Sequence, residues 1–279
     1  MSQQITKVKS RIKTVSSALK VTSAMKLVST VKLKKWKNKM IANRKYAKNI
    51  DETTSLFLSF AKKYQSPLAI PNQSEKNLYI VITSSLGLCG SYNMNVFKLA
   101  DSLIQENDDL IVLGGKGVTH YKDFKNNKLV GFDDYSSLAD EKLVRKLIDK
   151  SIKEYLKGTY HEVHLIYSSY KNSLVFIPKD YRLLPLNKRE INDNEYPPIF
   201  EPSEKELLDT LVPIYLKTML HSKLLESEVC EQAARSNAME NATDNANELL
   251  NGLQIEFNKA RQGAITQEII EVVAASERV

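Results

Sequence analysis

The sequence predicts an α/β fold combined with a coiled coil, in which long N- and C-terminal helices pair antiparallel and a central α/β domain lies between them in the chain. No proline occurs before Pro67 or after Pro213, and no glycine precedes Gly87. Because proline removes a backbone donor and clashes with the preceding turn, its absence from both ends but not from the middle favours long terminal helices. In the middle, short apolar runs alternate with helix-like segments, which is typical of an α/β domain.

The first helix is expected from about residue 4 to residue 60, within an N-terminal coiled-coil segment formed by residues 1–65. At 1.5 Å per residue it would be roughly 85 Å long. Apolar residues recur in steps of three and four, with a change of register between Met25 and Leu33, which predicts one narrow coiled-coil seam. The seam residues are Ile5, Val8, Ile12, Val15, Leu19 and Thr22 in the first register, and Leu33, Trp36, Met40, Asn43, Ala47, Ile50, Thr54 and Phe57 in the second.

This helix carries a one-signed charge. Residues 1–50 contain 14 Lys and Arg but no Asp or Glu, and the first acid is Asp51. Such a helix cannot neutralise itself through pairs four residues apart, so it favours an acidic partner. The partner could be nucleic acid or an acidic protein surface. The alternative is that the basic face has no partner and is exposed to solvent.

A proline-bearing linker, residues 66–76, leads into the central domain, residues 76–190. Strands are expected at residues 78–83, 109–113, 162–167, 174–177 and 182–186. Helices are expected at residues 93–106, from the turn at 114–117 through Phe124, and at 138–156. Strands alternating with helices predict a mostly parallel, Rossmann-like α/β sheet with an antiparallel edge late in the chain.

The C-terminal coiled-coil segment is formed by residues 203–279. Ser203 followed by Glu206 forms a capping box at the start of the helix, and Pro213 should kink or restart it. The small residues Ala233, Ala234, Ala238, Ala242 and Ala246 would let another helix approach closely, so residues 1–65 and 203–279 should form one shaft.

The end of this helix is strongly apolar. Ile265, Ile269, Ile270, Val272 and Val273 are too much apolar surface for a free end in water, so we expect something to enclose this tip.

The sequence shows no catalytic or metal-binding constellation, and we expect neither an enzyme nor a bound cofactor. The four histidines have no ligand spacing with Cys89 and Cys230, and Cys89 lacks a nearby histidine base. The Gly114–Gly117 segment matches neither phosphate-binding fingerprint and is interpreted as a tight strand-to-helix turn.

No run of eighteen apolar residues occurs, so no direct membrane insertion is expected. Hydrophobic content of 42% and charged content of 26% are typical of a globular protein, and two cysteines indicate reduced thiols rather than a disulfide framework.

Three segments carry a resemblance to a known family. Residues 20–28 (KVTSAMKLV), followed by Lys32-Leu33, resemble the opening helix of the gamma subunit of F-type ATP synthases. Residues 83–93 (TSSLGLCGSYN) are similar to that family's turn after the first strand. The sequence AARSNAMENATDNA within residues 228–246 and the sequence NKARQGAITQEIIEVV at residues 258–273 are the most specific matches, and the resemblance spans essentially the whole chain.

The resemblance implies a central rotor that catalyses nothing itself. The terminal helices would pass through a ring of three alpha and three beta subunits, and the α/β domain would lie against the epsilon subunit and the membrane c-ring. Turning of the shaft would couple ATP synthesis or hydrolysis to proton flow. The implied location is the cytoplasmic face of a bacterial cell membrane, as a peripheral protein, with no nucleic acid among its partners. The acid-free helix would then face acidic levers of the beta subunits.

The resemblance also implies interface positions. Met25 and Lys26 match the shaft position facing the beta levers, and Arg235 matches the arginine of the small-residue segment. Five residues match a polar collar that hydrogen-bonds to beta-subunit loops, namely Arg261, Gln262, Thr266, Gln267 and Glu268. The apolar tip at residues 265–275 would lie in a bearing at the top of the ring. Each of these residues is also compatible with an ordinary solvated helix surface.

The chain departs from the family pattern at several positions. Ser85 and Leu86 stand where Asp-Arg is usual, Ser236 replaces a methionine, and residues 274–276 replace a glycine-rich ending. Contacts at the base of the rotor are therefore uncertain, and the shaft of a paralogous motor not coupled to ion translocation stays open. Two further classes are a basic coiled coil that binds nucleic acid and a nucleotide-dependent enzyme that uses Gly114–Gly117.

Overall fold

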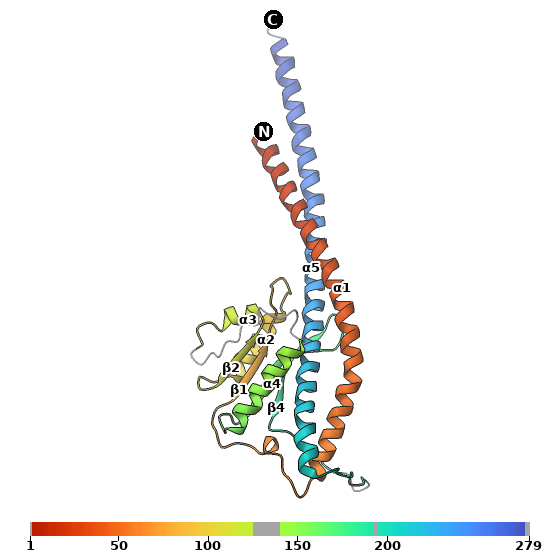
Figure 1. Ribbon diagram of the computed structural model, residues 1–279. Coiled ribbons are helices and arrows are strands. Elements are labelled where there is room, and N and C mark those ends of the chain that lie inside the picture. The colour runs from red at the N-terminus through yellow and green to blue at the C-terminus, as the bar shows by residue number, and fades with distance from the viewer. Residues whose placement is uncertain (1, 125–139, 192–194, 277–279) are drawn as a thin grey trace. The chain divides into compact units, whose positions relative to one another are not determined.

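The computed structural model describes residues 2–124, 140–191 and 195–276, so the expected helix start at Leu138 lies outside the described residues. The chain forms two compact units: Met1–Thr30 with Arg235–Val279, and Val31–Ala234. The helices α1 (Ser2–Phe60) and α5 (Glu204–Ser276) each contribute to both units (Figure 1).

The second unit contains a four-stranded sheet in the order β2-β1-β3-β4. Its strands are β1 (Leu78–Ile82), β2 (Asp109–Leu113), β3 (Val163–Tyr170) and β4 (Phe176–Leu184). Strand β1 pairs parallel with both β2 and β3, whereas β4 is antiparallel to β3. The expectation of a mostly parallel sheet with an antiparallel edge is confirmed.

The two short strands expected at residues 174–177 and 182–186 are wrong, because the structure has the single strand β4 there. It pairs with β3 from Phe176 opposite Tyr170 to Leu184 opposite Val163. Its middle, Pro178-Lys179-Asp180, lacks the apolar pattern that sequence analysis requires. An edge strand accepts proline and charged residues because one side of its backbone needs no ladder partner.

Helices cover both faces of this sheet (Figure 1). Short helices α2 (Tyr92–Leu103) and α3 (Gly115–His120) pack on Tyr79, Val81 and Ile166 of one face. On the other face, α4 (Glu141–Leu156) and the parts of α1 and α5 in this unit bury a larger core, and a 3-10 turn (Pro67–Ala69) adds Leu68. Strands β1 and β2 bury both faces, which explains their continuous apolar runs.

Helix α5 begins as the sequence predicts. Ser203 precedes the helix, and its Oγ accepts a hydrogen bond from the Glu206 N–H at 3.2 Å. The helix continues through Pro213 and does not restart there. The neighbours Val212 and Leu216 are fully buried, so packing holds the helix across the one missing backbone hydrogen bond.

In the first unit, α1 and α5 run antiparallel. Three side-chain contacts join them: Thr22 to Thr243 at 3.0 Å, Lys26 to Glu240 at 2.7 Å, and Thr30 to Ser236 at 3.0 Å. As the residue number rises along one helix it falls along the other, so the expected antiparallel coiled coil is confirmed.

Candidate functional site

The last turns of α5 expose a continuous apolar surface. The five residues expected to form the tip are between 48% and 65% exposed, namely Ile265, Ile269, Ile270, Val272 and Val273. The side chains of Ala274 and Ala275 lie outside the description. Because apolar surface of this extent is unfavourable in water, the tip is a candidate docking surface.

Among the described residues, the polar side chains beside the tip have contacts within their own helix. Thr266 Oγ1 donates to the Gln262 carbonyl at 2.9 Å, and Gln267 Nε2 donates to Glu271 Oε1 at 2.9 Å. Arg261 and Glu268 are also exposed. The five collar residues therefore share one stretch of helix and present side chains that a partner could reach.

Met25, Lys26 and Arg235 lie in the paired part of the same unit. Lys26 forms a hydrogen-bonded salt bridge with Glu240. This hydrogen bond raises the pKa of the Lys26 ammonium above its ordinary value. Met25 is partly exposed, whereas Arg235 is only 6% exposed. Arg235 is therefore a buried residue in the isolated chain.

Sequence analysis missed exposed apolar residues on α1. Val21, Leu27 and Val28 are all more than half exposed and lie outside the seam that pairs with α5. Val21 and Val28 are seven residues apart, which is close to two helical turns, whereas Leu27 lies about a third of a turn away from Val21. Together with the lysines, they make the outer surface of α1 both basic and apolar.

The Gly114–Gly117 turn is not a phosphate site. The Lys116 N–H donates to the Ser84 carbonyl at 3.1 Å, and the Gly117 N–H donates to Thr83 Oγ1 at 3.0 Å. A Cβ at Gly114 would lie 2.3 Å from the Thr83 carbonyl oxygen. Two of the backbone donors are already used, β2 ends at Leu113 and α3 begins at Gly115, so the interpretation as a tight strand-to-helix turn is confirmed.

The other strand-following turn is held by a small polar network. Asn93 Nδ2 donates to Ser84 Oγ at 2.7 Å and to Cys89 Sγ at 3.3 Å. The turn holds Leu86 and Leu88 outward at 68% and 60% exposure, and Leu88 adopts a φ of +63°. A non-glycine residue in that region is costly, so the network fixes a strained, outward-facing leucine pair.

No group of three or more metal-ligating side chains occurs among the described residues. His164 contacts Asp180 and Glu162, each at 2.9 Å. Burial alone would lower the pKa of His164, but the hydrogen bonds and charges of these two carboxylates outweigh it and raise that pKa. His164 therefore links β3 to β4 through Asp180, and both of its ring nitrogens already have carboxylate partners.

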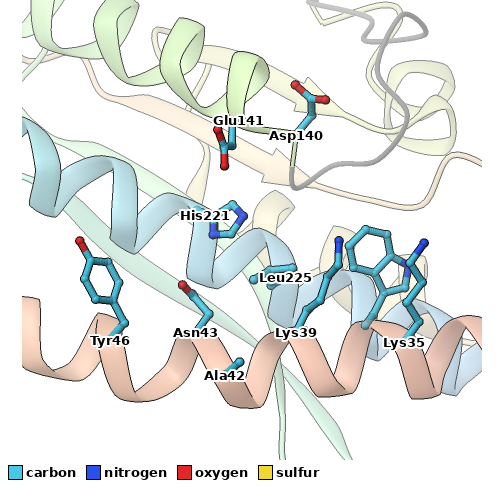
Figure 2. Close-up of a pocket in the computed structure, with 10 residues that line it drawn as sticks. Lys35, Lys39, Ala42, Asn43, Tyr46, Asp140, Glu141, His221 and Leu225 are labelled. Carbon is cyan, nitrogen blue, oxygen red and sulfur yellow. The ribbon is translucent and has the colours of Figure 1, made fainter.

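A groove of about 710 Å³ lies between α1, α4 and α5 in the second unit (Figure 2). Lys35, Lys39 and Tyr46 of α1 face Glu141 at the start of α4, and His221 of α5 lies between them. Its lining combines basic, acidic and aromatic side chains.

Within the described part of the chain, no helix is both long enough and apolar enough to cross a membrane. What the structure presents is a pair of long helices with an exposed apolar end, an exposed basic and apolar flank, and a packed α/β domain. These features define a class of protein: a coiled-coil scaffold to which other polypeptides bind.

Comparison with known proteins makes this class specific. Residues 4–279 match the family model described as ATP synthase. The ATP synthase gamma chain of Mycoplasmopsis agalactiae is 36% identical over 284 residues, with 99% of each chain covered. The ATP synthase gamma chain of Alkaliphilus metalliredigens is 35% identical over 282 residues, covering 97% of this chain and 96% of that one. The chain belongs to the ATP synthase gamma-chain family.

Solved structures agree at the level of the fold. A chain from the Euglena gracilis mitochondrial ATP synthase, in a structure of its OSCP, F1 and c-ring, has a TM-score of 0.72 at 16% identity. The match covers 99% of this chain and 94% of that one. A central stalk and c-ring structure from Tetrahymena thermophila gives a TM-score of 0.58 at 24% identity, covering 80% of this chain and 99% of that one.

Proposed function

We propose that this chain is the central-stalk rotor of a bacterial F-type ATP synthase and that it transmits rotation without catalysing a reaction itself. Three alpha and three beta subunits would surround its paired helices, and the α/β domain would contact the epsilon subunit and the c-ring. The observation that carries the proposal is the exposed apolar tip of α5 in a chain whose gamma-chain relatives match over nearly their full length.

The charge of α1 supports an acidic partner surface. Of the 14 cations in residues 1–50, two form salt bridges within the described structure, Lys26 with Glu240 and Lys48 with Glu52. The remaining cations need counter-charge from elsewhere. The acidic levers implied for the beta subunits would supply it, and Val21, Leu27 and Val28 would add apolar contact.

The rotor–stator contacts are assigned to the positions that the resemblance indicates. Met25 and Lys26 would meet the beta levers, and buried Arg235 would act by holding the two helices in place behind them. The collar would bind beta-subunit loops through Arg261, Gln262, Thr266, Gln267 and Glu268. Residues 265–275 would turn within an apolar bearing, where a non-directional interaction permits rotation at little cost.

The Gly114–Gly117 turn and the exposed surfaces support a non-catalytic role and a peripheral location. The N–H groups of Lys116 and Gly117 already have partners within the turn, as in a structural rather than a phosphate-binding segment. The exposed surfaces suit protein partners, so the chain would be held by the complex at the cytoplasmic face of the membrane.

Assembly is the decisive test. The chain would be expressed with the alpha and beta subunits from the same genome, and the product weighed by native mass spectrometry. We expect a complex of three alpha, three beta and one copy of this chain that hydrolyses ATP. A chain that stays free, or that co-purifies with nucleic acid, would contradict the proposal.

The tip can be tested separately in the assembled complex. Truncation after Gln262 should leave assembly partly intact while weakening the coupling of hydrolysis to rotation, because the bearing surface is gone. The matched control is Ile255→Ser, which removes an equally exposed isoleucine of α5 outside the tip. Unchanged coupling in the truncated complex would refute the bearing role.

One observation favours a second candidate, a paralogous motor without ion translocation. Leu86 is strongly exposed at a position where the family resemblance implies arginine, and Ser85 stands in place of an acid. A contact that depends on charge would be lost there. Reconstitution with the c-ring of the same organism would distinguish the two: ATP-driven ion pumping supports the ATP synthase, and hydrolysis without binding of the c-ring supports the paralogue.

A further inference from the structure

The groove between α1, α4 and α5 is a built recess with opposite charges on its two walls (Figure 2). Its volume of about 710 Å³ lies within the range typical of small-molecule sites. A second hollow of about 220 Å³ shares Asn43, Tyr46 and His221 with it and extends toward Arg145 and Lys217.

The α1 wall carries two uncompensated cations. Lys35 and Lys39 lie one helical turn apart, so their side chains project on the same side. Both ammonium groups lie over the Trp36 ring, at 5.8 Å and 4.7 Å from its centroid, and neither has a carboxylate partner among the described residues. Two neighbouring ammonium groups without counter-charge favour a ligand that carries at least two negative charges.

The α4 wall is acidic, but one of its two carboxylates already accepts hydrogen bonds from the backbone. Asp140 caps α4, and its carboxylate accepts the Lys142 N–H at 2.8 Å and the Leu143 N–H at 3.4 Å. Glu141 beside it is exposed and faces the groove as an acceptor (Figure 2). A ligand that spans the groove therefore needs anionic groups at one end and hydrogen-bond donors at the other.

The floor adds aromatic surface and an unpaired donor. Tyr46 is 52% exposed and lines the recess on the same helix face as the lysines. The Nδ2 atom of Asn43, which also lines the recess, is buried and has no hydrogen-bond partner among the described residues. Because this atom is closed to solvent, the surface that a ligand would meet here is the ring of Tyr46.

We propose that this groove binds a nucleoside phosphate. The phosphate groups would lie against Lys35 and Lys39, because lysine is a common phosphate ligand. The base would stack on Tyr46, and an exocyclic amine would donate to Glu141. This combination of polyanion, flat ring and donor matches the three parts of the groove, whereas a simple anion would leave the acidic wall unused. The site is independent of the rotor proposal and of the Gly114–Gly117 turn.

Trp36 provides the measurement, since it is the only tryptophan of the chain and lines the groove. The full-length protein would be titrated with ATP at 50 mM and 200 mM salt while Trp36 fluorescence is followed, and calorimetry would give the stoichiometry. We expect saturable binding of one ATP per chain. Lys35→Gln and Lys39→Gln should each weaken binding about tenfold or more, as for loss of one charge-assisted contact.

Lys34→Gln is the matched control. Lys34 is an exposed lysine on the same turn of α1 that does not line the groove, so its loss should change affinity less than about twofold. Equal weakening by Lys34→Gln and Lys39→Gln would mean general attraction to a basic helix and would overturn the proposal.

Three further probes fix the ligand class. Pyrophosphate and adenosine should each bind at least about tenfold more weakly than ATP, because each satisfies only one wall. Pyrophosphate that binds as tightly as ATP would overturn the nucleoside assignment. A poly-glutamate peptide that displaces ATP at stoichiometric amounts would overturn it in favour of an acidic polypeptide segment, and the absence of any ATP signal or heat would overturn it outright.

Discussion

The sheet of the α/β domain and the last turns of α5 use the same residue types in opposite ways. Ile111 in β2 is fully buried, whereas Ile269 in α5 is 58% exposed. Burial of one such side chain is worth about 1.5–3 kcal/mol, so the sheet gains that stabilisation within the chain and the tip does not. Apolar surface kept where the chain itself gains nothing from it indicates a partner. The comparison separates residues that maintain the fold from residues that serve the complex.

The largest expected contrast is between alanine substitutions at these two isoleucines. Ile111→Ala should lower the free energy of unfolding by about 2–5 kcal/mol, because it leaves a cavity in a packed core. Ile269→Ala should change it by less than about 0.5 kcal/mol in the isolated chain. Urea unfolding followed by circular dichroism measures both values.

An equal loss of unfolding free energy in Ile111→Ala and Ile269→Ala would contradict the distinction between core and tip. It would mean that the tip is already packed against another copy of the chain in solution. Repeating the Ile269→Ala measurement at several protein concentrations tests this, because a self-associated tip makes stability depend on concentration.

Two glycines, one in the packed domain and one in α5, should respond in opposite directions to substitution by alanine, with effects of intermediate size. A Cβ at Gly117 would lie 2.4 Å from Val112 Cγ1 and 2.6 Å from Thr83 Oγ1, so Gly117→Ala should cost about 1–3 kcal/mol through overpacking. Gly252 lies inside α5 with no atom within 4 Å of its Cβ position, so Gly252→Ala should stabilise by about 0.5–1 kcal/mol. Thermal unfolding of both variants measures whether each substitution lowers or raises the stability. Stabilisation by Gly117→Ala would show that the turn relaxes more easily than its contacts indicate.

Local patterns were sufficient for much of the fold. The expected strand at residues 109–113 coincides with β2, and the expected first helix ends where α1 ends, because buried parallel strands and long seams leave strong periodic signals. Strand β4 was missed, since Pro178 and Asp180 on an edge break the alternation that identifies strands.

The sites were less predictable than the elements. The tip and collar follow from one continuous stretch of sequence. The groove combines Lys39, Glu141 and His221, which lie on three helices far apart in the chain, and no spacing in the sequence links them. The burial of Arg235 was not predictable either, because a charged residue in a helix is ordinarily expected at the surface.

The smallest expected effect concerns His164, a charged group inside the sheet domain. Its ring stacks on Tyr79 at 5.0 Å, and its two nitrogens contact Asp180 and Glu162, while Arg182 also binds Glu162 at 2.9 Å. The carboxylates overcome the effect of burial and raise the pKa of His164 above its ordinary value of 6.5. The folded state therefore binds the proton more tightly than the unfolded chain.

This linkage sets the direction of the pH dependence. The stabilisation should be fully present below about pH 6.5 and should be lost as the pH rises through the pKa of the folded state. The difference in unfolding free energy between the wild type and His164→Gln should therefore shrink from pH 6 to pH 9. His161→Gln is the control, because His161 Nδ1 contacts the backbone carbonyl of Asn72 at 2.6 Å and no carboxylate contact is seen at its ring among the described residues. A difference for His164→Gln that grows with pH would show that folding lowers the pKa of His164, so that burial outweighs the two carboxylates.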